Sequence, residues 1–400
     1  MSEAAFSGLR VIDLCDGRAG AYCTKWFADF GAEVIKIEPP AGAALRARGP
    51  FVGDRPHPET GASFLYLDTG KKSITLNLEQ PLAVRIARRL IATADVLVED
   101  RAPGSLDAIE LSYPELEADN PRLVYLSISP FGQNGPYRDY PATDLTLAAF
   151  SGTMHDRMIA GRNPVRMGGA QGDAIAGRVA FIATMGALLH REATGRGQHI
   201  DLSMLEAIAG NDLAAPTTYS YNGMVHQPRR QPAARGRGGL GRYPCKDGWV
   251  DVMPGVGGLK KLAILLGDPS LAEHELFTDH ALRAKHADAF DAEFMIPWLE
   301  TRNRDEVVEQ AQRLGMPFSY TLSTDELLRD PQLEARGFFV TVEQPVTGPV
   351  TQPGPPARLS GSRWEAKPAP VLGSANHDVL VGELGYTREQ LTQLREQGIA

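Results

Sequence analysis

The sequence has little of what marks a metalloprotein, a disulfide-rich secreted protein or a nucleic-acid-binding protein. Its three cysteines, Cys15, Cys23 and Cys245, are widely spaced, with no CxxC pair and no metal-ligand spacing. We therefore expect a reducing compartment and no metal site. The formal net charge is −8, so no overall basic excess favours nucleic acid or an anionic membrane surface as a partner.

Long apolar runs and targeting segments are also missing. The first ten residues, MSEAAFSGLR, lack the basic and apolar regions of a signal peptide. The chain has no uninterrupted run of about 18 apolar residues, so we expect no membrane span. The motifs GxSxG and HExxH do not occur either. A cytoplasmic protein is the expectation that these absences leave.

What is present is an alternation of short apolar runs with stretches of helical spacing. Strands are expected at 9–14, 33–38, 73–78, 95–99, 123–129 and 199–204, and helices at 20–30 and 82–93. Strands that alternate with helices predict an α/β fold with a doubly wound parallel sheet, covered on both faces. The chain has 400 residues, which suggests two domains or one large domain with an insertion.

A further helix is expected at 174–191, directly after Asp173. Its apolar residues Ile175, Val179, Ile182, Gly186 and Leu189 form one stripe, which predicts a buried helix. An aspartate before a helix is a favoured N-cap, and capping alone would explain it. Capping is compatible with catalysis, because the helix-end amides favour the carboxylate form. An ionised carboxylate can attack an activated acyl carbon and form a covalent intermediate.

The composition changes after about Asn222. The segment 228–242 holds five arginines and four glycines, which is typical of a loop or linker. Helical patterns follow near 258–266 and 284–296, and a surface helix is expected at 388–397. The segment 345–358 carries five prolines and predicts an extended connector.

The first strand-to-helix turn nearly matches a dinucleotide fingerprint. Cys15-Asp-Gly17-Arg-Ala-Gly20 is GxGxxG with cysteine in the first place, and Glu38 lies at the distance of a ribose-binding acid. The missing glycine argues against a dinucleotide. Gly17 and Gly20 would equally allow a tight turn between strand and helix.

Several charged residues follow predicted strands, where open parallel sheets bind ligands. The segment 68–73 ends like a phosphate loop, but Leu65 stands where the earlier glycine belongs. Its two lysines could hold phosphate or form a solvated face. Glu99 and Asp100 could bind a ribose or cap a turn, and His155 beside Asp156 could be catalytic or an ordinary loop histidine. The cations that could form a local basic cluster are Arg46, Arg48, Lys71, Lys72 and Arg101.

Eight collinear segments together resemble the class III CoA-transferase family, which also includes α-methylacyl-CoA racemases. The matching segments are Leu9–Leu14 (LRVIDL), Phe27–Pro39 (FADFGAEVIKIEP), Asp95–Glu99 (DVLVE), Pro103-Gly104, Phe131–Tyr137 (FGQNGPY), Gly172–Gly177 (GDAIAG), Thr194–Glu206 (TGRGQHIDLSMLE) and Asp330–Phe339 (DPQLEARGFF). They span nearly the whole chain, which makes the resemblance specific.

The resemblance implies a large Rossmann-like domain from residues 1–222 and 331–400, with a smaller inserted α+β domain at 223–330. It implies an interlocked homodimer, and acyl-CoA and a carboxylic acid as substrates, with no permanently bound cofactor. Asp173 aligns with the family's catalytic aspartate, and Gly238 and Gly239 lie in a loose match to a glycine-rich loop that shields the intermediates. CoA contacts are expected from Arg18, Arg46, Lys71, Lys72, Asp100 and Arg101.

For a transferase, the resemblance implies that the Asp173 carboxylate attacks the thioester of an acyl-CoA. The mixed anhydride that forms reacts with CoA thiolate to give an aspartyl-CoA thioester, and an acceptor carboxylate then takes over the CoA. Each step develops an oxyanion that nearby N–H groups would stabilise.

Three departures from the family pattern affect the choice of activity. Racemases of the family carry a histidine where this chain has Thr143, before Asp144, so a two-base proton exchange lacks its partner unless His155 substitutes. The family's Asn-Phe-Arg-Pro-Gly is here Asp100-Arg-Ala-Pro-Gly104, which displaces the arginine by one. Arg18 replaces the glutamine of formyl-CoA transferases, and could pair with an acid substrate or with Asp173.

These departures favour a CoA-transferase without supporting the specific formyl/oxalate activity. Two alternatives stay open from the sequence. One is an acyl-CoA α-epimerase that uses Asp173 and another base. The other is a non-catalytic acyl-CoA-binding relative that keeps the fold.

Overall fold

The computed structural model describes residues 4–158, 162–211, 215–225, 238–255 and 258–400, and they form two compact units. Unit 1 comprises residues 4–158, 164–225 and 335–400, and unit 2 comprises residues 162–163 and 238–334. The arginine-rich stretch expected to link domains falls largely at 228–237, outside the described residues. Each unit has its own hydrophobic core.

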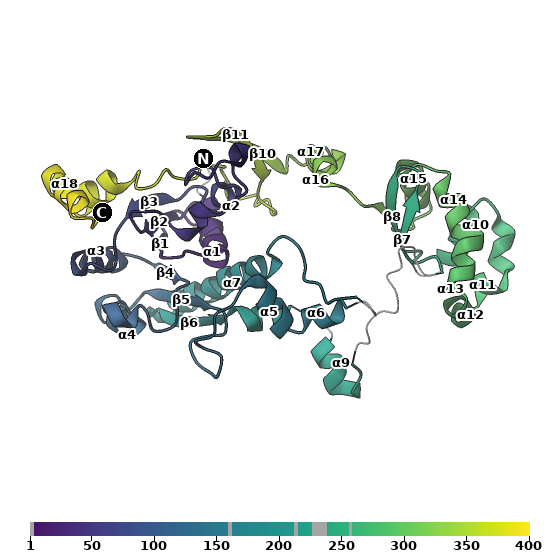
Figure 1. Ribbon diagram of the computed structural model, residues 1–400, viewed down its shortest axis with the longest axis horizontal. Coiled ribbons are helices and arrows are strands. Elements are labelled where there is room, and N and C mark those ends of the chain that lie inside the picture. Colours follow the sequence, from purple (N-terminus) through teal and green to yellow (C-terminus); the bar gives the residue numbers. More distant parts are fainter. Residues whose placement is uncertain (1–3, 159–161, 212–214, 226–237, 256–257) are drawn as a thin grey trace. The chain divides into compact units, whose positions relative to one another are not determined.

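Unit 1 is built on a six-stranded sheet in the order β3-β2-β1-β4-β5-β6, with every neighbouring pair parallel (Figure 1). The predicted parallel sheet is therefore confirmed. The strand order reverses between β1 and β4, which is where open sheets of this kind form a ligand crevice. The strands are β1 (Arg10–Asp13), β2 (Glu33–Glu38), β3 (Lys72–Thr75), β4 (Val96–Glu99), β5 (Val124–Ser129) and β6 (Gln198–Ser203).

Helices cover both faces of this sheet, because successive strand side chains point to opposite faces. Ile12 packs among residues of α3, α4 and the C-terminal helices, whereas its neighbour Val11 packs among residues of α1 and α7. The segment 335–400 belongs to unit 1 and contributes to the first of these faces. The helices are α1 (Arg18–Asp29), α2 (Ala62–Leu67), α3 (Pro81–Ile91), α4 (Tyr113–Asp119), α5 (Asp144–Phe150), α6 (Thr153–Asp156), α7 (Gln171–Thr194), α8 (Met204–Gly210), α9 (Ala215–Asn222) and α18 (Arg388–Glu396), with a π-helix at His377–Glu383 and short 3-10 turns at Ala44–Ala47, Val52–Asp54 and Asp107–Ile109.

Helix α7 buries a different face from the one its large apolar residues indicate. Ile175 is buried, but Val179, Ile182 and Leu189 are 38%, 67% and 69% exposed. The buried face consists mainly of small residues, which let α7 approach α1 closely. At Gly177 a Cβ atom would lie 2.7 Å from the carbonyl oxygen of Ala19, so only glycine fits the crossing. The expectation of a buried apolar stripe was therefore wrong.

By length and mean hydropathy alone, α7 could also cross a membrane. Its apolar window has a mean hydropathy of 1.4, and 39% of that window is buried within the structure. Core helices pass the same test, and α7 packs against α1, β5 and β6. We therefore describe it as a core helix of unit 1.

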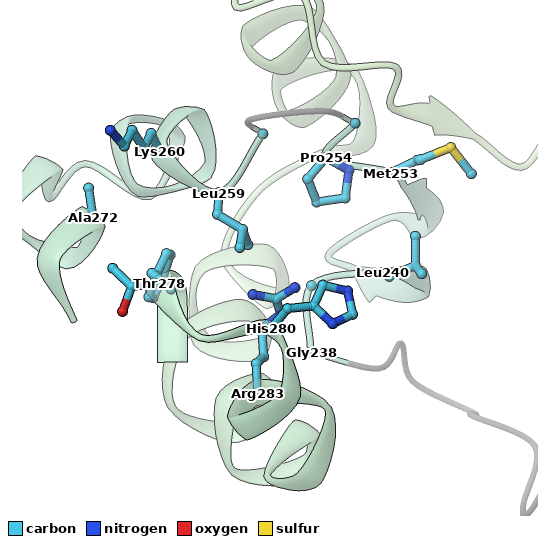
Figure 2. A pocket seen from close by; sticks show the side chains of 14 residues that line it. Gly238, Leu240, Met253, Pro254, Leu259, Lys260, Ala272, Thr278, His280 and Arg283 are labelled. Carbon is cyan, nitrogen blue, oxygen red and sulfur yellow. The ribbon is translucent and has the colours of Figure 1, made fainter. Parts of the chain in front are cut away.

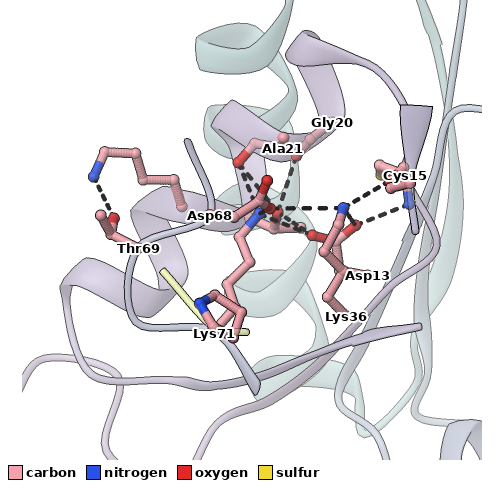
Figure 3. A network of polar contacts seen from close by, with 12 residues as sticks. Asp13, Cys15, Gly20, Ala21, Lys36, Asp68, Thr69 and Lys71 are labelled. Carbon is pink, nitrogen blue, oxygen red and sulfur yellow. Dashed lines mark hydrogen bonds and ion pairs between the residues drawn. The ribbon is translucent and has the colours of Figure 1, made fainter. Parts of the chain in front are cut away.

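A network of buried charges lies between β1, β2 and the loop before β3 (Figure 3). The Lys71 ammonium lies 2.9 Å from Asp13 Oδ2 and 2.6 Å from Asp68 Oδ1, and all three side chains are fully buried. Lys36 adds contacts to the same two carboxylates and donates to the carbonyl oxygen of Cys15. Burial alone would raise the pKa of Asp13, but Lys36 and Lys71 hold it below its usual range.

The sequence predicted that Lys71 and Lys72 could both hold phosphate or form a solvated face, and this network shows that the two lysines differ. Lys71 points into the core and is fully occupied by protein carboxylates, whereas Lys72 is exposed and paired with Glu33. A cation held in this way cannot also bind a phosphate without leaving two buried carboxylates uncompensated. Lys71 is therefore not available to contact a ligand.

The proline-rich segment near the C-terminus forms a strand instead of an extended connector. Strand β11 (Gly348–Pro353) pairs antiparallel with β10 (Phe339–Gln344). Pro349 and Pro353 are tolerated because the hairpin has only two strands, so each strand has an unpaired edge that needs no donors.

Unit 2 is an α+β unit around a three-stranded antiparallel sheet, β7-β8-β9. Its core joins Tyr243 and Val250 of the sheet to Leu262, Phe290 and Leu299 of the helices. The elements are β7 (Gly241–Cys245), β8 (Gly248–Val252), β9 (Ser319–Tyr320), α10 (Gly258–Leu265), α11 (Glu275–Thr278), α12 (His280–Lys285), α13 (Ala287–Phe290), α14 (Ile296–Glu300), α15 (Arg304–Arg313), α16 (Thr324–Leu327) and α17 (Pro331–Ala335, which ends in unit 1), with a 3-10 turn at Pro269–Glu273 and a π-helix at Asp291–Met295.

The buried network predicts a large difference between two adjacent lysines. Lys71→Met should lower the free energy of unfolding by about 3–5 kcal/mol, because it leaves Lys36 alone to compensate the two buried carboxylates of Asp13 and Asp68. Lys72→Met is the matched control and should cost less than about 1 kcal/mol, because its ion pair is exposed. Urea unfolding followed by circular dichroism measures both, and equal losses would contradict the account of Lys71.

Candidate active site

Asp173 lies in the first turn of α7, at the carboxyl edge of the sheet. The helix begins at Gln171 with Ala170 at the N-cap position, so Asp173 is two residues inside the helix and does not cap it. The capping expectation was therefore wrong, although the residue does lie near the positive end of the helix dipole. Ala170 has a left-handed backbone (φ 52°), a conformation that costs a non-glycine residue roughly 1–3 kcal/mol.

Charged side chains from three segments surround Asp173. Arg18, in the first turn of α1, lies with Nη1 3.9 Å from Asp173 Oδ2. Asp144, in the first turn of α5, accepts the Gly172 N–H at 2.9 Å and pairs with Arg166 at 2.9 Å. A Cβ atom at position 172 would lie 2.7 Å from Asp144 Oδ1, so a larger residue there would have to displace the Asp144 carboxylate.

These neighbours act in opposite directions on the pKa of Asp173. Burial raises it and the Asp144 carboxylate raises it further, while Arg18, Arg48 and Arg166 lower it, and the net result is a raised pKa. The sequence led us to expect that the helix start would keep Asp173 ionised. The structure instead describes a partly desolvated carboxylate whose ionisation depends on the nearby arginines.

The Asp100 carboxylate lies at the N-terminus of α1, where backbone N–H groups can bind an anion. Its carboxylate accepts N–H bonds from Asp16 and Gly17, each at 2.8 Å. Burial raises its pKa to about 6 despite these two hydrogen bonds. The sequence left open whether Asp100 binds a ribose or caps a turn, and in the structure it caps the turn at Asp16 and Gly17. A protein carboxylate thus occupies the position where a dinucleotide phosphate would bind.

The remaining predicted cations do not form one exposed cluster. Arg46 is 1% exposed and is held by Glu38 through Nε and Nη2, at 2.6 and 2.8 Å, and by Glu59 at 2.7 Å. Arg46 thus holds Glu38, the expected ribose acid, inside the fold. Arg101 remains accessible, with Nη2 3.9 Å from Asp16. The predicted cations therefore do not form a basic cluster. Arg48 is exposed, and its charge lowers the pKa of Asp173.

A pocket of about 410 Å³ opens beside β4 and β5, lined by Glu99, Ser127, His199, Gln133 and Arg138, among others. Burial raises the pKa of Glu99 to about 7. Gln133 Nε2 and Arg138 Nε are buried and have no hydrogen-bond partner in the described part of the chain. Glu99 therefore remains a candidate for binding a ribose, whereas Asp100 is occupied by the turn that it caps.

Gly238 and Gly239, the glycines expected to shield the intermediates, donate their N–H groups to other residues of unit 2. The Gly238 and Gly239 N–H groups donate to the Asp291 carboxylate, each at 3.1 Å, and Gly239 also donates to Tyr243 Oη. Both glycines have positive φ angles, 56° and 81°. Gly236 and Arg237, the first two residues of the glycine-rich match at 236–241, lie outside the described residues.

The residues weighed as a second base lie on two short helices. Thr143 is exposed and caps α5, with its hydroxyl accepting the Thr146 N–H. His155 is exposed on α6. Across the described ranges, no group of three or more His, Cys, Asp or Glu side chains could hold a metal ion.

The sequence missed the role of Arg166 and the influence of Asp144 on Asp173. Asp144 is 29 positions from Asp173, and Arg166 is seven positions from it but lies before the helix begins at Gln171, so no local periodicity links these residues. The one local signal was Thr143-Asp144 before an apolar run, which predicts a helix start. Two helix starts at the same sheet edge can bring their first turns together, but the sequence does not state which ones do.

Fold and site together define an α/β protein with a half-buried carboxylate among arginines at the carboxyl edge of a doubly wound sheet. Residues 6–376 match CoA-transferase family III. The chain is 32% identical over 405 residues to a succinyl-CoA:(R)-benzylsuccinate CoA-transferase subunit of Thauera aromatica, covering 98% of this chain and 97% of that subunit. It is also 32% identical over 416 residues to the formyl-CoA:oxalate CoA-transferase of Streptomyces coelicolor, covering 100% of both.

Among solved structures, a CAIB/BAIF family protein from Brucella suis matches with a TM-score of 0.84 and 29% identity, covering 95% of this chain and 99% of that one. The chain therefore belongs to CoA-transferase family III, which confirms the resemblance found in the sequence. CoA-transferase activity, with CoA thioesters as substrates, is the general function that these relatives support.

The charges around Asp173 predict opposite shifts of its pKa in two variants. Arg18→Met should raise the pKa further, because it removes a cation that favours the carboxylate. Asp144→Asn should lower it, because it removes a like charge while the amide oxygen can still accept the Gly172 N–H. Carboxyl ¹³C NMR of aspartate-labelled protein measures both, with Asp173→Asn assigning the resonance. Shifts in the same direction would refute the arrangement.

Proposed function

We propose that this protein moves CoA from an acyl-CoA thioester to a carboxylic acid, with Asp173 as the covalent nucleophile. The observation that carries the proposal is the setting of Asp173, in the first turn of α7 with Arg18 nearby and a left-handed Ala170 before it. Desolvation makes its carboxylate more reactive once ionised, and Arg18 favours that ionised form.

The proposed reaction has two symmetrical halves. An Asp173 oxygen attacks the thioester carbon, CoA thiolate leaves, and a mixed anhydride forms. The thiolate then attacks the aspartyl carbonyl, which releases the donor acid with that oxygen and leaves an aspartyl-CoA thioester. In the second half an acceptor carboxylate displaces the thiolate to form a new anhydride, and the thiolate attacks the acceptor carbonyl to give the new acyl-CoA and free Asp173.

Arg18 has a defined part in this scheme. Its guanidinium lies 3.9 Å from Asp173 Oδ2 and is 29% exposed, so it can also reach a bound carboxylate. Each anhydride step brings a second carboxylate to Asp173, and an arginine at this point offsets their mutual repulsion. Succinyl-CoA is our choice of donor, since a relative from Thauera is named for it.

We propose that the adenosine end of CoA binds in the pocket beside β4 and β5. Glu99 offers a carboxyl group for ribose hydroxyls, and Gln133 offers an amide donor without a hydrogen-bond partner in the described chain. Arg138 adds a cation whose Nε lies 3.9 Å from the exposed carboxylate of Asp139. Arg101 is accessible near the same strand end and could contact phosphate. Arg46 and Lys71 are not part of this proposal, because both are held inside the fold.

We further propose that the chain works as a homodimer, with α7 in the interface. Val179, Ile182 and Leu189 leave an apolar stripe exposed along a helix of 24 residues, and exposed apolar patches commonly mark protein–protein contacts. The relative from Thauera is named as a subunit, which supports an oligomeric assembly.

Trapping of the covalent intermediate tests the role of Asp173. After incubation with succinyl-CoA, hydroxylamine should convert Asp173 to a hydroxamate that peptide mass spectrometry detects. Asp173→Ala should lose the label and lower turnover by roughly four orders of magnitude. Asp305→Asn, a change at an exposed aspartate of α15, is the matched control and should keep both. A label that persists in Asp173→Ala would rule out the covalent role.

Isotope exchange separates the transferase from an α-epimerase. A 2-methylacyl-CoA incubated with the protein in heavy water should gain no α-deuterium by proton NMR, because an exposed capping threonine occupies the position of the second base. Wash-in of deuterium at the α-carbon would favour the epimerase instead. If CoA binds, but no acid yields a new thioester, the protein is an acyl-CoA-binding relative without turnover.

A further inference from the structure

A pocket of about 520 Å³ lies within unit 2 and is formed entirely by residues of that unit (Figure 2). This volume is in the range of small-molecule sites. Much of its lining is apolar, with Leu240, Met253, Leu259 and Phe277 as the larger side chains. None of its lining residues is acidic. The pocket therefore offers an apolar surface with no negative charge to repel an anion.

Arg283 of α12 supplies a buried positive charge to this pocket. Its side chain points toward the centre of the pocket in Figure 2, and the residue is only 8% exposed. The one hydrogen bond of its side chain to the described chain runs from Nη1 to the carbonyl oxygen of Leu276, at 3.4 Å. Within the described ranges no acidic side chain forms an ion pair with it. A buried cation without a counter-charge is costly, and an anionic ligand would remove that cost.

Gly238 forms the part of the pocket wall that holds the Arg283 side chain. A Cβ atom at Gly238 would lie 3.0 Å from Arg283 Cγ, so the arginine stem packs directly against the glycine backbone. The Asp291 carboxylate in turn accepts the Gly238 and Gly239 amides and the Tyr243 hydroxyl. Asp291 is therefore occupied by these donors, and Arg283 is held in place with its guanidinium available.

We propose that this pocket binds an organic acid, with the carboxylate on the Arg283 guanidinium and an apolar chain along Leu240, Leu259 and Phe277. Arginine suits this role because its planar fork matches the two oxygens of a carboxylate. His280, which is exposed at the pocket, adds a donor for the same anion, whereas the Lys260 ammonium points away from Arg283 in Figure 2. Only the further step, that such an acid is a substrate of the CoA transfer, rests on the proposed function.

Titration calorimetry of the full-length protein with hexanoate and with hexanamide tests the proposal. Hexanoate should bind at least about tenfold more tightly than the neutral amide, because only the acid compensates the buried charge. Arg283→Met should bring hexanoate down to the affinity of hexanamide. Arg313→Met, a change at an exposed arginine of α15, is the matched control and should bind hexanoate as the unaltered protein does. Equal affinities for acid and amide in the unaltered protein would overturn the proposal.

A second variant covers the case in which Arg283→Met does not fold. Leu240 is 50% exposed at the pocket, so Leu240→Glu adds a negative charge there without disturbing the core. It should weaken hexanoate binding about tenfold and leave hexanamide binding unchanged. Unchanged hexanoate binding in this variant would equally overturn the proposal, as would inorganic phosphate that competes with hexanoate at equal concentration.

Binding is measured without CoA, and again in Asp173→Ala, which keeps the two proposals distinguishable. If CoA transfer fails but hexanoate still binds through Arg283, the proposal for the pocket is supported and the proposed transferase activity is wrong. If CoA transfer succeeds but hexanoate does not bind, the pocket proposal alone is wrong.

Discussion

The close crossing of α1 and α7 is the constraint on which the candidate site depends. Gly177 allows the two helices to approach until only a hydrogen fits against the carbonyl oxygen of Ala19. Both helices start at the carboxyl edge of the sheet, so this crossing brings their first turns together. Arg18 then lies beside Asp173, and the charge balance at the carboxylate follows from the helix packing.

Two groups of charges serve different purposes in unit 1. Asp13, Lys36, Asp68 and Lys71 are fully buried and neutralise one another inside the fold, beneath the sheet edge. The group around Asp173 is only partly buried and leaves Arg18 within reach of a ligand. The first group holds the strand ends and their loops together. The second can change its balance when a charged substrate arrives, as a carboxylate exchange requires.

The sheet and the identity of the candidate nucleophile could be predicted from the sequence. Apolar runs at 9–14 and 33–38 alternate with helical stretches, and this local pattern is enough to specify a parallel sheet. Asp173 stood out because glycines precede it and a helix follows. The ion pairs were beyond such reasoning, because Lys71 pairs with Asp13 across 58 positions of the chain. A lysine beside a glycine looks exposed until its partners are known.

Helix α7 shows why apolar spacing predicted the helix but not its buried face. Large apolar residues occupy one stripe and small residues another, and the spacing of both is helical. A stripe of Ala and Gly permits the closer approach, so packing density selects it as the buried face of a single chain. The large apolar stripe is left exposed, and it is the part of the helix that we assign to a second copy.

Transfer of oxygen to Asp173 tests the central claim most directly. The protein is turned over with an acyl-CoA and its own free acid, the acid carrying heavy oxygen in its carboxylate. An anhydride route leaves one acceptor oxygen on the aspartate in each cycle, so the peptide that contains Asp173 should gain heavy oxygen by mass spectrometry. Turnover that leaves this peptide unlabelled would show that CoA passes between acids without covalent participation of Asp173.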